Sequence, residues 1–395
     1  MVFCVRDPSK TAFSNGSAPS VPINRSRPHN NCSSPANALK ILESNMQSPV
    51  LSITILSLAG LLAANFTSIS VGQEPTPEIR IGIIGLDTSH CIAFTKLLNA
   101  ENATAPLDVC RVVCAYPKGS RDIESSVSRV SQYTKQIQSM GVAIVDSIDE
   151  LISRVDAVLL ETNDGRPHLE QVLPVLKANK PVFIDKPIAG SLVDAVAIFE
   201  AAKHFGTPVF SSSSLRFVKP ALAARSGSLV GKVVGCETFS PAKLESTHPD
   251  LYWYGIHGVE QLFTVMGSGC QSVARTNTPS TDVVVGVWND GRIGTFRGTR
   301  NGPHHYGGTV FGEKGEAPTG GSEGYAALVT EIANFFDSRI PPVKPRETIE
   351  IYAFMSAADI SKQRDGGRVQ LAEVLKTASR EAIQRLHKLG IETEQ

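Results

Sequence analysis

Strand-like apolar runs alternate with helical patterns over residues 79–214. The first strand is expected at IRIGIIG (79–85), and later strands at 107–116, 142–145, 155–162, 180–185 and 208–214. Helices are expected in the gaps, and Ser191 with Asp194 forms a capping-box-like start of one of them. Such regular alternation predicts a parallel, doubly wound sheet, that is, a Rossmann-type α/β fold.

The pattern changes after about residue 216. Short strand-like runs separated by turns follow, and NDGR (289–292) between two of them is a hairpin signal. Three helical patterns close the chain, at 325–336, 347–363 and 374–389. We therefore expect a Rossmann-type domain at 78–213 and an α+β domain with a mostly antiparallel open sheet at 214–395.

The first 77 residues carry no sign of either domain. Residues 1–45 are rich in Ser, Asn and Pro, which predicts disorder, and no charged residue occurs from Asn45 to Gln73. The apolar run 50–64 is typical of a signal peptide, with small residues before Gln73 for cleavage and Met46 as a candidate start. An exported protein, periplasmic or secreted, is expected; a membrane anchor and a cytoplasmic protein are the alternatives.

The charge balance of the chain limits the classes of binding partner to expect. Lys+Arg and Asp+Glu both number 38 among 395 residues, so the formal net charge is zero. Nucleic-acid binding favours a basic excess, so no nucleic-acid partner is expected.

Ligands of open parallel sheets bind beyond the carboxyl ends of the strands. After the first strand, Gly85 opens a loop that resembles the G-x-G-x-x-G fingerprint, with Asp87 and His90 at the second and third glycine positions. Thr88 or Ser89 is expected to cap the next helix, and Asp87 to accept from its free amides. Two interpretations stay open: a remodelled cofactor loop, and a helix cap on a fold without a dinucleotide.

The other strand ends supply further candidates. No acidic residue follows the second strand directly. Lys118, Ser120 and Arg121 lie there instead, and they favour NADP at least as much as NAD. The alternative is a solvated loop that binds no ligand. Beyond later strands, we expect these residues to face the cleft: Thr162, Asn163, His168, Asp185 and Lys186. Pro187 restricts the backbone of Lys186, which is a candidate general acid or a surface salt-bridge partner.

These residues carry a resemblance to the glucose–fructose oxidoreductase / inositol dehydrogenase family (Gfo/Idh/MocA). It covers about 78–371, through RIGIIG, the 155–187 segment, YGIHGVEQLFTVMG and the segment 346–371. The resemblance implies that Lys186 touches both nicotinamide and substrate. The family's catalytic Asp and His lie in D-x-G-x-H; here Gly255 and His257 are kept and Trp253 replaces the Asp.

Two questions around His257 stay open. Tyr254 or Glu260 can substitute for the missing carboxylate neighbour, and the spacing of His257 and Glu260 also matches a metal pair. The family pattern has no metal, and none is expected here. Tyr252, Trp253 and Tyr254 are either core residues or a stacking surface for a sugar ring.

The resemblance predicts an oxidoreductase that transfers hydride between NAD or NADP and a sugar, polyol or related cyclic substrate. Lys186, His257 and Tyr254 are its candidate catalytic residues. The alternatives are a redox-inactive carbohydrate-binding or scaffold protein and an NAD-dependent glycoside-cleaving enzyme. A homo-oligomer through the open sheet of the second domain is expected.

Overall fold

A computed structural model describes residues 78–303 and 305–393 of the chain. All of them fall in one compact unit, Gly72–Gln395. The expected disordered tail and signal peptide, residues 1–77, lie outside the described residues and stay predictions.

The amino-terminal half forms a six-stranded parallel sheet in the order β3-β2-β1-β4-β5-β6. Its inner strands are apolar and buried, with all four residues of β4 sealed, because helices cover both faces of a parallel sheet. The predicted Rossmann-type fold is confirmed. In chain order the strands are β1 (Ile79–Ile84), β2 (Cys110–Tyr116), β3 (Ala143–Ile144), β4 (Ala157–Leu160), β5 (Val182–Ile184) and β6 (Val209–Ser211).

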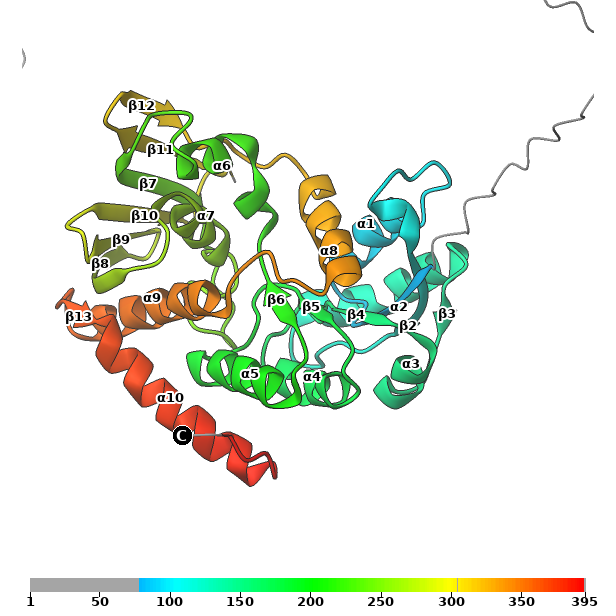
Figure 1. The fold of residues 1–395 in the computed structure, drawn as a ribbon. Helices are drawn as coiled ribbons and strands as arrows, with labels where there is room; N and C mark the ends of the chain where they lie inside the picture. The colour runs from blue at the N-terminus through cyan, green and yellow to red at the C-terminus, as the bar shows by residue number, and fades with distance from the viewer. Residues whose placement is uncertain (1–77, 304, 394–395) are drawn as a thin grey trace, which may run out of the picture. The chain divides into compact units, whose positions relative to one another are not determined.

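Helices connect these strands as expected (Figure 1). The Ser191 side chain accepts a hydrogen bond from the Asp194 amide at 3.0 Å, which confirms the predicted cap of α5. In chain order the helices are α1 (Ser89–Leu98), α2 (Glu124–Ser139), α3 (Ile148–Arg154), α4 (His168–Lys177) and α5 (Leu192–Phe205).

The second sheet has seven strands in the order β12-β11-β7-β10-β9-β8-β13. Only β7 and β10 pair in parallel among them, and the predicted hairpin joins β9 to β10. The strands are β7 (Val233–Pro241), β8 (Cys270–Thr278), β9 (Thr281–Trp288), β10 (Ile293–Thr299), β11 (Gly307–Gly312), β12 (Gly315–Pro318) and β13 (Val369–Gln370).

One face of this sheet is covered and the other is open. Along β9, alternate residues are buried and half-buried, as expected for a sheet with one packed face. The packed face meets α7 and α9, where Phe263 contacts Trp288 and Phe354. The later helices are α6 (Lys219–Arg225), α7 (Ile256–Met266), α8 (Ala326–Ser338), α9 (Pro345–Gln363) and α10 (Leu371–Lys388).

Two late helices return to the Rossmann-type sheet. Helix α8 shares a hydrophobic core with β1, α1 and β5. The ring centre of its Phe335 lies 4.9 Å from the ring centre of Phe210 in β6. Helix α10 packs along α5, as Figure 1 shows. The expected domain boundary at residue 213 therefore divides the sheets but not the helices that cover them.

The two halves are joined by a buried tyrosine contact beside β5. The Tyr352 hydroxyl accepts from the Ile188 amide at 2.7 Å, and Tyr252 packs edge-on against the Tyr352 ring. This contact fixes α9 against the loop after β5, where Lys186 lies.

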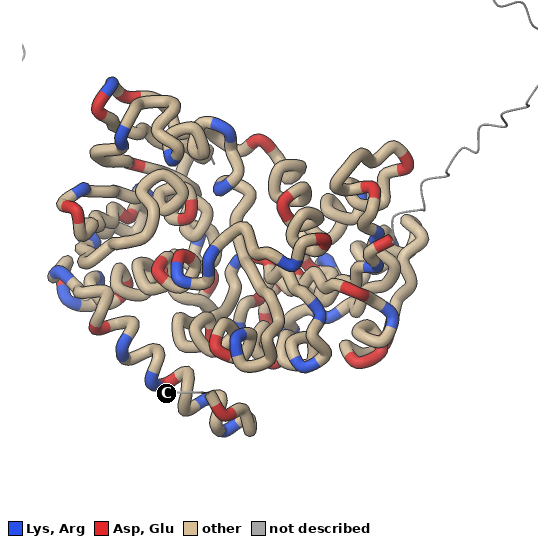
Figure 2. The backbone as a smooth tube through the Cα atoms, viewed as in Figure 1, with Lys and Arg blue, Asp and Glu red and all other residues tan. Residues whose placement is uncertain are grey.

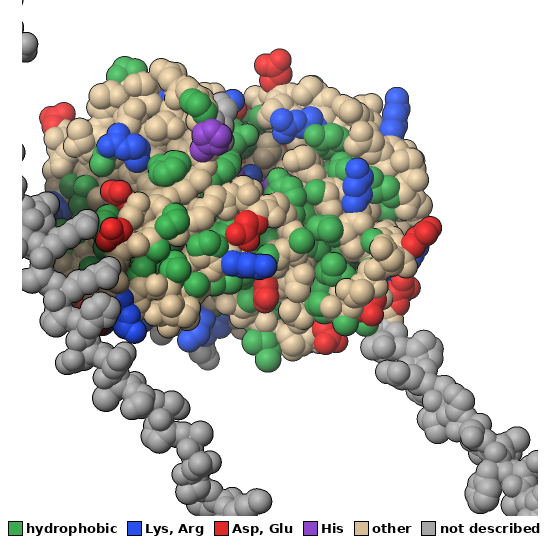
Figure 3. All heavy atoms as spheres, turned by 90° about the horizontal axis from the view of Figure 1, so that it is seen from above, with side chains coloured by type: hydrophobic (Ala, Val, Ile, Leu, Met, Phe, Trp, Pro, Cys, Tyr) green, Lys and Arg blue, Asp and Glu red, His purple; other side chains and the backbone are tan. Residues whose placement is uncertain are grey.

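Charged side chains are spread over both halves. Figure 2 shows basic and acidic residues interspersed along the backbone, and the face in Figure 3 shows them scattered among apolar side chains. Among the helices that the structure describes, none combines the length and apolar character needed to cross a bilayer.

Candidate active site

Lys186 and His257 come from opposite halves and lie close enough for the charge of Lys186 to act on the imidazole. Lys186 follows β5, next to a cis peptide bond to Pro187, and His257 lies in the first turn of α7. Burial, and after it the charge of Lys186, hold the pKa of His257 well below its usual range. The structure therefore brings the two expected catalytic side chains near each other.

A chain of hydrogen bonds holds the His257 ring from behind. Its Nδ1 lies 2.7 Å from the Ser213 hydroxyl, whose backbone amide donates to Glu260 at 2.9 Å. Arg216 in turn donates to Glu260 at 2.7 Å and to Glu347 at 2.6 Å. Glu260 therefore supports His257 through Ser213, and is not the direct carboxylate neighbour that the sequence left open.

His90 pairs directly with a carboxylate. Its Nδ1 lies 2.8 Å from Asp185 Oδ2, and both side chains are buried. Burial raises the pKa of Asp185, but the charges of His90 and Lys186 outweigh burial and lower it to about 2. The imidazole–carboxylate pair of this cleft thus lies on the Rossmann side.

Three half-buried tyrosines surround the two histidines. The ring of Tyr254 lies 6.2 Å from that of His257, and Tyr306 lies 5.6 Å from it on another side. Tyr325, at the start of α8, lies 4.7 Å from His90 and beside Ser89. Aromatic rings with polar tips suit a ligand that has both apolar faces and hydroxyl groups.

The three aromatic residues before His257 have separate surroundings. Tyr252 is fully buried in the core, whereas Tyr254 faces His257. Trp253 packs on His248, 5.1 Å between ring centres, and its indole has no acidic proton to replace that of an aspartic acid. Core packing holds for Tyr252, and the stacking interpretation is left to Tyr254.

The loop after β1 keeps the first glycine of the fingerprint. Gly85 has a φ of 97°, and a Cβ there would lie 2.3 Å from the Thr162 amide nitrogen, so β1 and β4 approach too closely for any side chain. Thr88 caps α1 by accepting from the His90 amide at 3.4 Å, as expected.

Asp87 does not accept from the start of α1, contrary to the expectation. Its carboxyl is fully buried and accepts from the Ser126 hydroxyl at 2.6 Å and from the Asn163 amide at 2.9 Å. It therefore ties the loop after β1 to α2 and to the loop after β4. Burial raises the pKa of this carboxyl above its ordinary value.

A pocket of about 400 Å³ opens beside the carboxyl end of β2, lined by Lys118, Ser120, Arg121, Thr162 and Asp164 among others. Ser120 donates to Asp164, which also accepts from Arg166. The Arg166 guanidinium reaches on to Asp122 at 2.7 Å. The candidate residues Lys118, Ser120 and Thr162 are thus gathered around one hollow.

His168 does not face the cleft. Its ring is fully buried, with Nε2 2.8 Å from the Thr162 carbonyl and Nδ1 3.1 Å from the Ile188 carbonyl. Through these two contacts the His168 ring links the loop after β4 to the loop after β5. Pro167 precedes this histidine as the N-cap of α4, and His168 and Leu169 in the first turn are buried.

Sequence reasoning missed several residues of this site. Ser213 follows β6, so the strand-end rule that identified Lys186 also applied to it. Tyr306 and Tyr325 come from distant loops with no local signal. Glu161, directly after β4, is fully buried, and neither carboxyl oxygen has a hydrogen-bond partner among the described residues.

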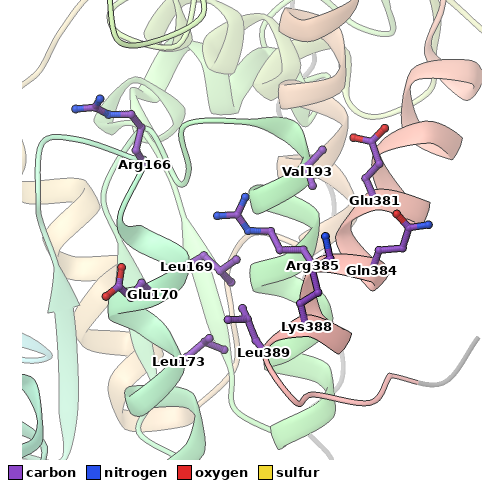
Figure 4. Close-up of a pocket in the computed structure, with 10 residues that line it drawn as sticks. All are labelled: Arg166, Leu169, Glu170, Leu173, Val193, Glu381, Gln384, Arg385, Lys388 and Leu389. Atoms are coloured by element: carbon purple, nitrogen blue, oxygen red, sulfur yellow. The ribbon is translucent and has the colours of Figure 1, made fainter.

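A separate groove of about 790 Å³ lies between α4, α5 and α10 (Figure 4). Apolar side chains such as Leu169 and Leu389 line it, and Arg385 and Glu381 stand at its rim. None of the candidate catalytic side chains lines this groove. Within the described ranges, no cluster of three or more His, Cys, Asp or Glu side chains is arranged to hold a metal ion.

Comparison with known proteins identifies the Rossmann-type half. Residues 79–212 match the profile of the Gfo/Idh/MocA oxidoreductase family with an NAD-binding Rossmann fold. An inositol 2-dehydrogenase of Cereibacter sphaeroides is 33% identical over 131 residues, 32% of this chain and 34% of that protein. Inositol 2-dehydrogenase 3 of Saccharopolyspora erythraea is 28% identical over 131 residues, 32% of this chain and 33% of that protein. The chain thus spans about a third of the length of these curated relatives.

Solved structures resemble both halves. A probable dehydrogenase from Thermotoga maritima aligns with a TM-score of 0.62 at 20% identity, covering 75% of this chain and 100% of that chain. A scyllo-inositol dehydrogenase from Lactobacillus casei, with bound NAD(H) and scyllo-inositol, aligns with a TM-score of 0.59 at 16% identity, covering 75% and 99%. At these identities the likeness establishes the two-domain fold. Residues 79–212 are therefore similar in sequence to the NAD-binding Rossmann domain of the Gfo/Idh/MocA oxidoreductase family, and the chain as a whole resembles dehydrogenases of known structure in its fold.

Proposed function

We propose that this protein is an NAD(P)-linked oxidoreductase that acts on a polyol, a sugar or a related cyclic alcohol. The observation that carries the proposal is the approach of Lys186 and His257 from opposite halves at the carboxyl end of the Rossmann sheet. That edge is where this fold binds ligands. The inositol dehydrogenases among the relatives support the substrate class.

The residues present fit a dinucleotide at both of its ends. Gly85 keeps the close turn, and the pocket by β2 offers Lys118, Ser120 and Arg121 to a ribose or its 2′-phosphate. At the other end Lys186 and Asp185 line the cleft. The diphosphate would cross the loop that holds Asp87, whose burial against Ser126 and Asn163 keeps its carboxyl turned into the protein.

Lys186 and the tyrosines suit an alcohol substrate. Lys186 makes no salt bridge with any described residue, so its ammonium group is available to hold a substrate oxygen. Tyr254, Tyr306 and Tyr325 offer hydroxyl groups and ring faces around the same space. When bound, the nicotinamide supplies a hydride acceptor; the side chains bind and orient the alcohol and move its proton.

The test is the formation of reduced nicotinamide, followed at 340 nm, with NAD or NADP and a panel of inositols, polyols and sugars. Lys186→Met should lower kcat/KM about 100-fold or more, because it removes the charge on the substrate oxygen. Lys203→Met, an exposed site on α5, is the matched control and should change nothing. A loss of less than tenfold in Lys186→Met contradicts the role of the ammonium group.

The buried Asp87 carboxyl and the presence of Trp253 in place of an Asp favour a second candidate, a redox-inactive carbohydrate-binding protein. Asp87 keeps a buried carboxyl beneath the loop that a diphosphate would cross, and Trp253 contacts His248 rather than completing a catalytic pair. Binding of sugars without affinity for either dinucleotide would support it. Glycoside cleavage without net formation of reduced nicotinamide would instead support the NAD-dependent hydrolytic alternative.

We also propose that the open sheet face joins two copies of the chain. Ile293 and Phe311 both pair with Gly235, so they lie on one face, and Phe239 lies four residues along the same strand. Their exposed fractions are 53%, 40% and 41%. An exposed apolar sheet face of this kind is typical of an interface.

Finally, we propose that the chain is exported, on the strength of its uncharged segment from Asn45 to Gln73. An exported dehydrogenase has to acquire its dinucleotide before export. N-terminal sequencing of the protein from its native source should show a start near Gln73. An intact N-terminus upstream of Met46 in a cytoplasmic fraction contradicts export.

A further inference from the structure

The two cleft histidines are held by different partners, and the partners set the position of each ring proton. His90 lies 2.8 Å from a carboxylate of Asp185, whereas His257 lies 2.7 Å from a hydroxyl of Ser213. The hydrogen bond at one ring nitrogen fixes what the other nitrogen can do.

Asp185 accepts only. Its pKa is lowered to about 2 despite burial, so it is ionised at neutral pH and has no proton to give. Nδ1 of His90 must therefore carry the hydrogen and donate it. In the neutral ring this leaves a lone pair on Nε2, so that nitrogen is an acceptor.

Ser213 has the opposite effect on His257. Its oxygen already accepts from the Leu215 amide at 3.2 Å, and its own hydrogen remains to be donated. Among the described residues, Nδ1 of His257 is the acceptor in reach. With Nδ1 accepting, the hydrogen of the neutral His257 ring lies on Nε2, which becomes a donor.

Both outer nitrogens are free to bind a ligand. Neither Nε2 has a hydrogen-bond partner among the described residues, and neither is fully buried. Of the ionisable groups around His90, Asp185 after β5 contacts its ring, Tyr325 before α8 packs against it, and His257 of α7 lies near it. Lys186 after β5 and Glu161 after β4 lie near Asp185.

We propose that His90, backed by Asp185, is the proton acceptor of the cleft, and that His257 is a hydrogen-bond donor that orients the substrate. The proposal rests on the proposed oxidoreductase function and reassigns the proton transfer expected at His257. The family pattern has an Asp at the position of Trp253, close to the catalytic His. In this chain the carboxylate that pairs with a histidine is Asp185, beside His90, in the Rossmann-type half.

The step balances as an alcohol oxidation. The hydroxyl O–H bond breaks and its proton goes to Nε2 of His90, while the carbon-bound hydrogen leaves with its electron pair to the oxidised dinucleotide. A carbonyl forms on the substrate. The resulting imidazolium is stabilised by Asp185 and returns its proton to solvent.

Histidine tautomers can be read directly by long-range ¹H–¹⁵N correlation on the full chain labelled with ¹⁵N-histidine, without any dinucleotide. Spectra of His90→Gln and His257→Gln assign the two signals, and exposed His387 on α10 is an internal reference. We expect the Nδ1–H form for His90 and the Nε2–H form for His257. Ser213→Ala should mix the tautomers of His257 alone. An Nε2–H form for His90 overturns the proposal.

Kinetics separate this inference from the proposed function. His90→Gln should lower kcat by about 100-fold with little change in KM, and His257→Gln should mainly raise KM. If the wild type oxidises an alcohol and His90→Gln stays within tenfold of its kcat, the proton acceptor lies elsewhere. If the wild type neither binds a dinucleotide nor turns over, the proposed function fails, and the tautomers still decide which ring accepts.

Discussion

Asp87 is the residue at which the proposed dinucleotide binding can be tested most sharply. Its carboxyl bridges Ser126 and Asn163 at the loop where a diphosphate would pass, and an ionised carboxylate there would repel it. Asp87→Asn keeps an acceptor for the Asn163 amide and removes the charge. We expect dinucleotide affinity, measured by calorimetric titration, to rise about tenfold.

Asp149→Asn on α3, an exposed acid, is the matched control and should leave affinity unchanged. The same affinity in a folded Asp87→Asn variant would show that the diphosphate does not pass this carboxyl.

Glu161 makes stability depend on pH. Burial, and after it the charges of Asp185 and Asp87, raise its pKa well above 4.5 in the folded chain. The folded state then binds a proton that the unfolded state releases, so stability is fully present below about pH 4.5 and is lost as pH rises toward the folded pKa. Glu161→Gln cannot ionise and removes this loss.

By urea denaturation, Glu161→Gln should match the wild type near pH 4 and exceed it by roughly 1 kcal/mol for each pH unit above that. Glu124→Gln, exposed at the start of α2, is the control. A pH-independent difference between Glu161→Gln and the wild type would mean that Glu161 does not titrate on unfolding.

At the scale of elements, α8 belongs to the Rossmann-type half although it lies more than a hundred residues after β6. Phe335 is fully buried against Phe210 there. Phe335→Ala should lower the free energy of unfolding by about 3 kcal/mol, because it leaves a cavity in that core. Ile340→Ala, at a site 72% exposed, should stay within about 0.5 kcal/mol by the same denaturation measurement. Equal effects would show that α8 is not docked.

The local pattern predicted most elements but not these long-range placements. Alternating strands and helices gave the parallel sheet, and the Ser191 cap and the β9–β10 hairpin were readable from a few neighbouring residues. The return of α8 and α10 was not, because an apolar stripe does not say which surface it covers. The same limit applies to the site: Lys186 stands at a strand end, whereas Tyr325 reaches His90 only through the fold.

For the whole molecule, the exposed apolar face of the second sheet predicts that two copies of the chain associate. Phe239→Glu should turn a dimer into a monomer by light scattering, since a charge replaces an apolar side chain at the centre of the face. Val127→Glu on α2, at a site 56% exposed, is the control and should not change the mass. A Phe239→Glu variant with the mass of the wild type contradicts this interface.

The central claim is that this fold binds a dinucleotide and uses it. The most direct measurement is urea denaturation of the wild type titrated with NAD(H) and NADP(H). A ligand of the folded state at 100 times its dissociation constant should add about 2.7 kcal/mol to the free energy of unfolding. We expect such a gain with at least one dinucleotide, and a larger one in Asp87→Asn at equal ligand concentration. No gain with any of the four, up to millimolar concentration, would contradict it.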